Sequence, residues 1–125
     1  MFVFDTSKDD FETVMRGYHA LAMKFLWEKG ERGVTTGETW VHVNKILMEK
    51  KESISRASII QFLSKIEEKG LATFIEKPGK GGYHRVYFPA YDEESFRRSI
   101  ADKVISKLLE IWPEETRAIL VEKLS

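Results

Sequence analysis

The stretch from Ser55 to Leu71 constrains the fold more than any other, because it contains a helix start, an apolar stripe and a helix stop in that order. Ser55 is a residue type that caps helix N-termini, and Gly70 is the type that ends helices. The apolar residues between them recur at helical spacing: Ile59, Phe62, Leu63 and Ile66. We therefore expect an amphipathic helix over about 55–69 with this side buried.

The opposite side of this helix carries mainly small and polar residues: Ala57, Gln61, Ser64 and Glu68, flanked by Ile60 and Lys65. Small and amide side chains allow close approach to the edges of bases, and glutamine can pair with adenine through two hydrogen bonds. This composition suits a helix that lies in a DNA groove. It also suits an ordinary amphipathic core helix, and this stretch alone favours the ordinary helix.

The segment before this helix predicts another helix, which would form a helix pair with it. Thr35 and Glu38 have the spacing of a capping box, in which the threonine serves the Glu38 amide and the glutamate reaches back. The helix that they open is expected to bury four apolar side chains: Trp40, Val43, Ile46 and Leu47. A charged turn around residues 50–52 follows it. Two helices joined by such a turn predict a helix-turn-helix over about 35–69.

The segment after the helix predicts a β-hairpin over about 71–89. Two runs of strand-forming residues, 71–77 and 83–88, flank the glycine-rich turn at 78–82, and Pro89 ends the second run. Its tip and inner edge are expected to present four basic residues: Lys77, Lys80, His84 and Arg85. A basic hairpin directly after a polar-faced helix is the arrangement of a winged helix-turn-helix, although a hairpin that is merely solvated remains the alternative.

Long helices are expected at both ends of the chain. Apolar residues repeat at helical spacing over about 8–29, where Thr6 or Ser7 could cap the helix, and again over 91–125. In the second region Asp92 can cap a long helix, and Pro113 suits the first residue of a short last helix. The short apolar arm before the first helix could pack on a neighbouring element or a partner subunit. The terminal helices could pair across a two-fold axis, or pack within the chain. The expected dimer contacts are Phe96, Ile100, Val104, Leu108, Ile111, Trp112, Ile119 and Leu120.

The charge of the chain is balanced overall but uneven along its length. The 125 residues contain 20 basic and 20 acidic side chains. Residues 34–90 carry 9 basic and 6 acidic side chains, a net charge of +3, whereas the two flanking segments are net negative. This excess of positive charge coincides with the predicted helix-turn-helix and hairpin, where a phosphate-binding surface would be needed.

Other kinds of site find little support in the sequence. The chain has no cysteine, which excludes disulfides, zinc–cysteine sites and thiol chemistry. The three histidines lack ligand spacing, the glycines around Lys80 do not form a phosphate-binding loop, and no nucleophile has an adjacent base. We expect no enzyme activity, metal or cofactor. No apolar run reaches the roughly 20 residues of a membrane helix, so we expect a soluble, cytoplasmic protein without membrane contact.

Several segments, taken in order, resemble the penicillinase-repressor family. Residues 23–30, Met-Lys-Phe-Leu-Trp-Glu-Lys-Gly, are similar to the end of that family's first helix. Residues 55–71 resemble its recognition helix, including the closing Lys-Gly-Leu. Tyr87-Phe88-Pro89 is similar to the end of its wing, and an acidic helix start follows. The likeness covers roughly residues 12–112.

The resemblance implies a dimeric winged-helix repressor that binds palindromic operators and dimerises through its C-terminal helices. By position, the residues that match the family's groove-facing positions are Ala57, Ser58, Ile60, Gln61, Ser64 and Lys65. Ile60 stands where a polar or basic residue is common, so it either contacts a thymine methyl group or is packed. The cysteine-rich tail of copper-responsive relatives and a clear protease-cleavage signature are absent from the sequence. Kinship with other winged-helix regulators remains open.

Together, these patterns predict a mainly α protein with a small β-hairpin wing: a DNA-binding domain over 1–90 and a helical dimerisation segment over 91–125. We expect a homodimeric repressor bound to an inverted repeat in double-stranded DNA, released by a small-molecule or protein effector. Arg56 joins Lys65 as an expected phosphate contact. Two alternatives stand: a winged helix used for protein–protein contact in transcription machinery, and a ligand-binding or enzymatic helical protein with a defined pocket.

Overall fold

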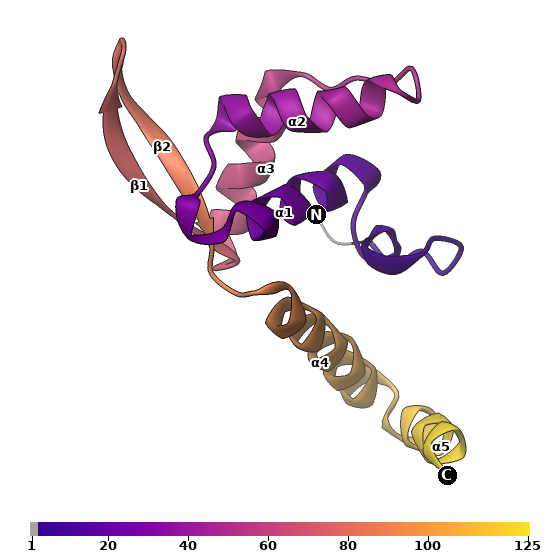
Figure 1. The fold of residues 1–125 in the computed structure, drawn as a ribbon. Coiled ribbons are helices and arrows are strands. Elements are labelled where there is room, and N and C mark those ends of the chain that lie inside the picture. Colours follow the sequence, from indigo (N-terminus) through magenta and orange to yellow (C-terminus); the bar gives the residue numbers. More distant parts are fainter. Residues whose placement is uncertain (1–2) are drawn as a thin grey trace. The chain divides into compact units, whose positions relative to one another are not determined.

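The computed structural model of the protein describes residues 3–125 and has mainly helical architecture with one β-hairpin, as the sequence predicts (Figure 1). Phe2, part of the predicted apolar arm, lies outside the described residues. The elements in chain order are η1 Asp10–Thr13, α1 Gly17–Lys29, η2 Gly30–Arg32, α2 Thr36–Met48, α3 Arg56–Glu68, β1 Ala72–Gly79, β2 Gly82–Pro89, α4 Glu93–Ile111 and α5 Pro113–Leu124, where η denotes a 3₁₀ helix.

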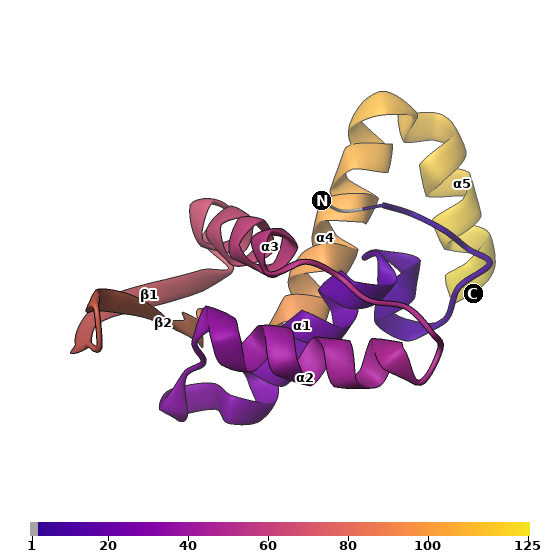
Figure 2. The same ribbon diagram turned by 90° about the horizontal axis from the view of Figure 1, so that it is seen from above.

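The elements form two compact units, one ending at Tyr91 and the other beginning at Asp92. In the first unit α1 packs on α2, α2 packs on α3, and the hairpin adjoins α3 and α1. Both views show the hairpin projecting away from the three helices (Figures 1 and 2). This is the arrangement of a winged helix-turn-helix, and it confirms the predicted fold class.

The buried side of α3 is the one that its sequence predicts. Ile59, Leu63 and Ile66 have no exposed surface, and Phe62 is 3% exposed. Ser55 caps the helix by accepting a hydrogen bond from the Ser58 amide at 3.1 Å. At the other end the amide of Leu71 donates to the Ile66 carbonyl at 2.8 Å, across Gly70 with a φ of 76°. That left-handed φ favours glycine, so the chain turns from helix into strand at this residue.

The connection between α2 and α3 is fixed by side chains of α2. The Asn44 side chain accepts a hydrogen bond from the Ile54 amide at 2.9 Å and donates one to the Ile54 carbonyl at 3.2 Å. The Trp40 indole donates to the same carbonyl at 3.0 Å. The main chain immediately before α3 is therefore held to α2 through both of its polar groups, which fixes where α3 begins.

The base of the wing is tied to the connection between α1 and α2. Val34 and Tyr87 form a β-bridge, with the Val34 amide donating at 2.9 Å and the Tyr87 amide at 2.8 Å. The adjoining Gly33 has a φ of 75°, and a Cβ there would lie 2.6 Å from atoms of Val86 and Phe88. Only glycine allows this close approach, so the wing is anchored where it leaves the helices.

The predicted first helix over 8–29 is wrong in its first half. The helix α1 begins only at Gly17, and Asp10–Thr13 form a short 3₁₀ helix instead. Asp5, rather than Thr6 or Ser7, organises the start, because its carboxylate accepts hydrogen bonds from the Ser7 amide at 3.0 Å and the Ser7 hydroxyl at 2.6 Å. Such a local turn competes with helix formation.

The main chain of this N-terminal segment is also extended rather than helical at its start. The Val3 amide donates to the Val14 carbonyl at 3.0 Å, and the Asp5 amide donates to the Thr13 carbonyl at 2.8 Å. Phe11 and Met15 are nevertheless buried, at 4% and 0% exposure. The apolar spacing is thus consistent with the burial of these two side chains, but it does not distinguish a helix from a folded-back segment.

The second unit consists of α4 and α5, which pack against each other. Asp92 caps α4 by accepting a hydrogen bond from the Ser95 amide at 2.7 Å, and Pro113 is the first residue of α5. The Thr116 hydroxyl donates to the Leu108 carbonyl at 3.1 Å across the bend. These starts are those that the sequence predicts.

Candidate nucleic-acid interface

The outward face of α3 is formed by most of the residues that the sequence proposes for base contact. Ala57, Ile60, Gln61 and Lys65 are exposed, and Ser64 is half-buried. Ser58 is half-buried, and its hydroxyl lies 3.0 Å from that of Ser55, within the helix cap. Ser58 therefore has a structural role in the N-terminus of α3, whereas the other side chains face away from the core.

A groove of about 550 Å³ runs between this face of α3, the start of α2 and the wing. From α3 it is lined by Arg56, Ile60 and Ser64, which lie one helical turn apart. The residues from the other elements are Thr35, Thr36, Gly37, Lys80, His84, Arg85 and Tyr87. Six predicted site residues are thus brought together here: Arg56, Ile60, Ser64, Lys80, His84 and Arg85. The lining does not include Ala57, Ser58, Gln61, Lys65 or Lys77.

The wing does not present its basic residues on one face. The strands pair in register through the tip, with Lys77 opposite His84 and Arg85 opposite Glu76. Neighbouring residues in a strand point to opposite faces, so Arg85 lies on the face opposite to Lys77 and His84. Lys80 occupies the two-residue turn, and Gly81 after it has a φ of 89°, which suits the third position of a type II turn.

Arg85 is held by aromatic residues at the base of the groove. Its Cζ lies 4.2 Å from the ring centroid of Phe74, and one guanidinium nitrogen donates to the Tyr87 hydroxyl at 3.4 Å. The hydrogen bond with Tyr87 is the main reason that the pKa of Arg85 is raised. The cation is therefore oriented before any ligand arrives, which reduces the entropy cost of binding an anion.

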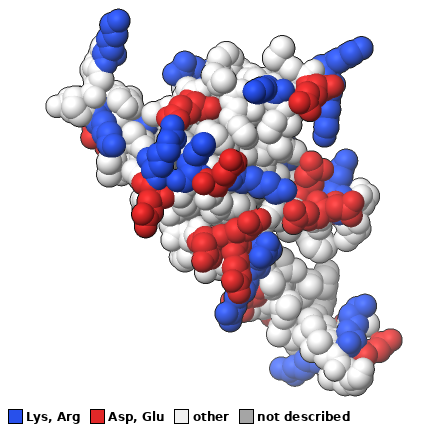
Figure 3. All heavy atoms as spheres, viewed as in Figure 1, with Lys and Arg blue, Asp and Glu red and all other residues white. Residues whose placement is uncertain are grey.

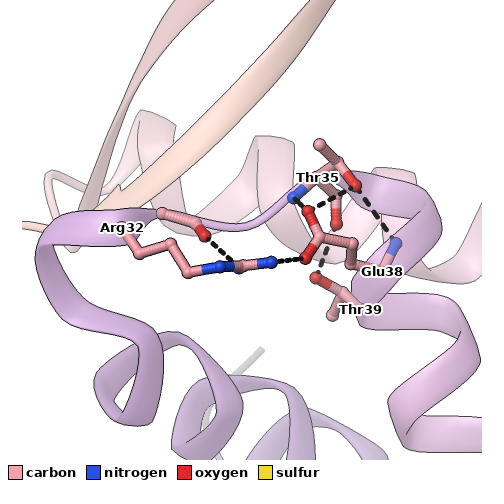
Figure 4. A network of polar contacts seen from close by, with 5 residues as sticks. Arg32, Thr35, Glu38 and Thr39 are labelled. Atoms are coloured by element: carbon pink, nitrogen blue, oxygen red, sulfur yellow. Dashed lines mark hydrogen bonds and ion pairs between the residues drawn. The ribbon is translucent and has the colours of Figure 1, made fainter.

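The N-terminus of α2 forms one wall of the groove. Its residues are not among those that the sequence predicts for the site. Thr35 accepts a hydrogen bond from the Glu38 amide at 3.1 Å, and the Glu38 carboxylate accepts one from the Thr35 amide at 3.3 Å (Figure 4). Arg32 also binds this carboxylate, and that hydrogen bond is the main reason that the pKa of Glu38 is lowered. The predicted capping box is confirmed, but nothing in its sequence indicates that it adjoins the wing.

Arg56 lies next to the start of α2, beside Gly37. A Cβ placed on Gly37 would lie 3.2 Å from a guanidinium nitrogen of Arg56, so the absence of a side chain at Gly37 leaves room for the cation. Blue side chains mark the wing and its tip, whereas red and blue intermingle over the helices (Figure 3). The wing tip and the α3 side of the groove therefore carry cations within an otherwise mixed surface.

His19 is half-buried and packs on the core residue Phe62, away from the groove. Its ring stacks on Phe62, with centroids 4.6 Å apart, and meets Tyr18 edge-on at 4.2 Å. Burial lowers the pKa of His19 to about 4. Within residues 3–125 no group of three His, Cys, Asp or Glu side chains is arranged to hold a metal ion. No helix in this part of the chain is long and apolar enough to cross a membrane.

The second unit exposes much of its apolar surface. Trp112 is 58% exposed and Leu124 is 83% exposed, and other large apolar side chains join them: Ile105, Ile111, Ile119 and Val121. Of the proposed dimer contacts, Ile100, Val104, Leu108 and Leu120 are half-buried, whereas Phe96 is buried at 1% exposure. Phe96 is therefore already covered, whereas Ile111, Trp112 and Ile119 remain exposed.

Comparison with known proteins identifies the family. No curated protein matches the chain. The family model described as "Penicillinase repressor" matches residues 19–125, which include α3, the wing and both C-terminal helices. The members of this family are transcriptional regulators. Because the match spans most of the chain, the protein belongs to the penicillinase-repressor family.

Proposed function

We propose that this protein is a homodimeric repressor that binds double-stranded DNA sequence-specifically. The groove between α3 and the wing is the observation that carries the proposal, because it combines an exposed helix face with cations on both sides. Arg56 lies on the α3 side, and Lys80 and Arg85 lie on the wing side. These three cations suit the groove to phosphate binding, in a chain whose total net charge is zero.

In the proposed complex α3 lies in the major groove of DNA. Arg56, Lys65 and the N-terminal end of α3 contact phosphates, which fix the position of the helix without selecting a sequence. Ala57, Gln61 and Ser64 contact base edges. The wing residues Lys80, His84 and Arg85 follow the backbone or the adjacent minor groove. Repression follows because the bound protein occupies promoter DNA.

The proposed dimer contacts lie on α4 and α5. A helical pair that leaves Ile111 at 44%, Trp112 at 58% and Ile119 at 48% exposure presents more apolar surface than an isolated unit of this size would keep in water. A two-fold interface would cover it, and a two-fold dimer carries two symmetry-related α3 helices. Such symmetry requires an inverted repeat.

The experiment that tests the proposal is selection of bound duplexes from a random DNA pool with the full chain. We expect enrichment of an inverted repeat whose half-sites lie about 10 base pairs apart or a multiple of that. Affinity for the selected site should fall steeply with salt, by a slope of roughly −0.9 for each phosphate neutralised. Failure to enrich any sequence, with binding that salt does not affect, would reject the proposal.

A second candidate function is protein–protein contact by the winged helix, favoured by the net charge of zero and by Glu76, which faces Arg85 across the wing. The double variant Lys80→Ala/Arg85→Ala separates the two functions. It should abolish most DNA affinity if the groove binds phosphates, and it should leave function intact if the domain only contacts protein. The matched control is Arg98→Ala, which removes a cation from α4.

A further inference from the structure

Ile60 is an apolar residue on the exposed face of α3, and it does not belong to the core. Its side chain is 48% exposed, whereas its neighbours Ile59 and Leu63 on the buried side have no exposed surface. Ile60 lines the groove between Arg56 and Ser64, one helical turn from each. Packing within the chain therefore does not explain why an isoleucine occupies this position.

Most of the other residues that line the groove with Ile60 carry polar side chains. One turn before it, the Arg56 guanidinium lies beside Gly37, and one turn after it stands the hydroxyl of Ser64. Across the groove are Lys80 and Arg85. The branched hydrocarbon of Ile60 has no polar group to offer to DNA. The apolar feature that a base pair presents in the major groove is the 5-methyl group of thymine.

We propose that Ile60 is a specificity-determining residue that contacts the 5-methyl group of a thymine in each half-site. This inference rests on the proposed DNA-binding function and names one feature of its target. Gln61 follows Ile60 directly, and successive residues of a helix point about 100° apart. The two side chains therefore contact different base positions, with Ile60 toward the wing and Gln61 away from it.

The experiment uses the full chain and the duplex recovered by selection. Each thymine is replaced in turn by deoxyuridine, which removes the methyl group and leaves every hydrogen-bonding group of the base pair in place. At one thymine per half-site, wild-type affinity should fall about 3- to 10-fold, the size expected for one lost methyl contact. Binding of Ile60→Ala to the unmodified duplex should fall by a similar factor, and the same deoxyuridine should then cost it nothing further.

Two control variants test whether the loss of affinity comes from the contact between Ile60 and the methyl group. Ile60→Val retains part of the hydrocarbon and should lose less affinity than Ile60→Ala, while still responding to the same deoxyuridine. Gln61→Ala should weaken binding to the thymine and deoxyuridine duplexes by the same factor. Because Ile60 is exposed on a helix and alanine favours helix, Ile60→Ala should unfold at a temperature close to that of the wild type.

The outcomes separate this inference from the proposed function. If the wild type prefers the selected duplex over a scrambled one but no deoxyuridine weakens binding, the role of Ile60 is overturned and the DNA-binding function stands. The role of Ile60 is overturned in the same way if the losses from Ile60→Ala and from deoxyuridine add at every position. If the wild type binds no sequence preferentially, both the inference and the proposed function are overturned.

Discussion

Arg85 lies over the ring of Phe74, on the opposite strand of the wing, with its Cζ 4.2 Å from the ring centroid. The two residues are not directly paired, since Phe74 faces Tyr87 and Arg85 faces Glu76. The contact is therefore a diagonal one across the hairpin, and the Tyr87 hydroxyl completes it. An arginine oriented in this way differs from a mobile lysine of the same charge.

This arrangement gives a prediction for the wing. Arg85→Ala should weaken binding to all DNA sequences alike and flatten the plot of log affinity against log salt by about one unit, because one phosphate contact is lost. Arg85→Lys should keep the salt dependence but bind more weakly, since lysine cannot reproduce the planar stacking. Fluorescence anisotropy titrations at several salt concentrations measure both effects, with Arg98→Ala as the control. A loss confined to the cognate site would contradict a phosphate contact.

Gln61 is exposed on the side of α3 away from the groove lining, and we predict that it contacts a base. Gln61→Ala should cost about 1–3 kcal/mol at the cognate site and relax the preference at one base pair, because two hydrogen bonds to an adenine would be lost. Competition binding with single-base variants of the site measures this. Equal losses on cognate and random DNA would show that Gln61 contacts no base edge.

The exposed apolar surface of the second unit gives a prediction about oligomeric state. Light scattering at micromolar concentration should give a mass of about 29 kDa, twice the 14.5 kDa of one chain. Ile119→Glu should shift the mass toward the monomer, because a charge would replace an apolar contact. Val41→Glu is the matched control, since Val41 is 59% exposed on α2. A wild-type mass near that of the monomer would be decisive against the dimer.

The depressed pKa of His19 makes stability depend on pH. Its folded pKa of about 4 lies below the ordinary value of 6.5, so the unfolded chain binds a proton that the folded chain excludes. This contribution is fully present above pH 6.5 and is lost as the pH falls towards 4, by an amount on the order of 1–3 kcal/mol.

Urea denaturation of His19→Phe at pH 7 and pH 4.5 checks this prediction. The variant keeps an aromatic ring against Phe62 but cannot take up a proton, so its stability should fall less on acidification than that of the wild type. His84→Gln, at the exposed wing, is the control and should behave as the wild type does. Carboxylates also titrate in this range, so the difference between variants is the informative quantity. Parallel pH profiles for all three proteins would refute the role of His19.

The hydrogen bonds between the Asn44 side chain and the Ile54 main chain should stabilise the fold. Asn44→Ala removes one hydrogen bond to each polar group of the Ile54 main chain, which should cost roughly 1–3 kcal/mol of unfolding free energy. The neighbouring Lys45→Ala changes an exposed side chain and should stay within about 0.5 kcal/mol of the wild type. Urea denaturation at pH 7 compares them. Equal stabilities would mean that water replaces the side chain at no cost.

Local sequence signals predicted much of the fold. The Thr35–Glu38 capping box, the Ser55 cap, the Asp92 cap and Pro113 all open helices where expected. These signals succeed because each acts within one turn of a helix. The prediction for the start of the chain is wrong because the Asp5–Ser7 turn and the pairing of Val3 with Val14 prevail there over apolar spacing.

The candidate site was less predictable, because its geometry depends on contacts distant in sequence. Thr35 and Lys80 line the same groove, yet no spacing rule connects them. The face of the wing on which each side chain lies depends on the register of the two strands. The sequence suggested a turn over 78–82, whereas the strands extend to Gly79 and resume at Gly82. Pro78 therefore lies in β1 opposite Tyr83, and the basic residues divide between two faces.

Complete pairing of the wing through its tip limits how this hairpin can change in length. Gly79 faces Gly82 across a turn of only two residues, so the loop cannot be shortened without breaking strand pairing. Insertion of a single residue into one strand would exchange the two faces of every residue beyond it, and Arg85 would leave Phe74. Homologous wings that keep the stacked arginine should therefore differ in length by matched pairs of residues, one from each strand.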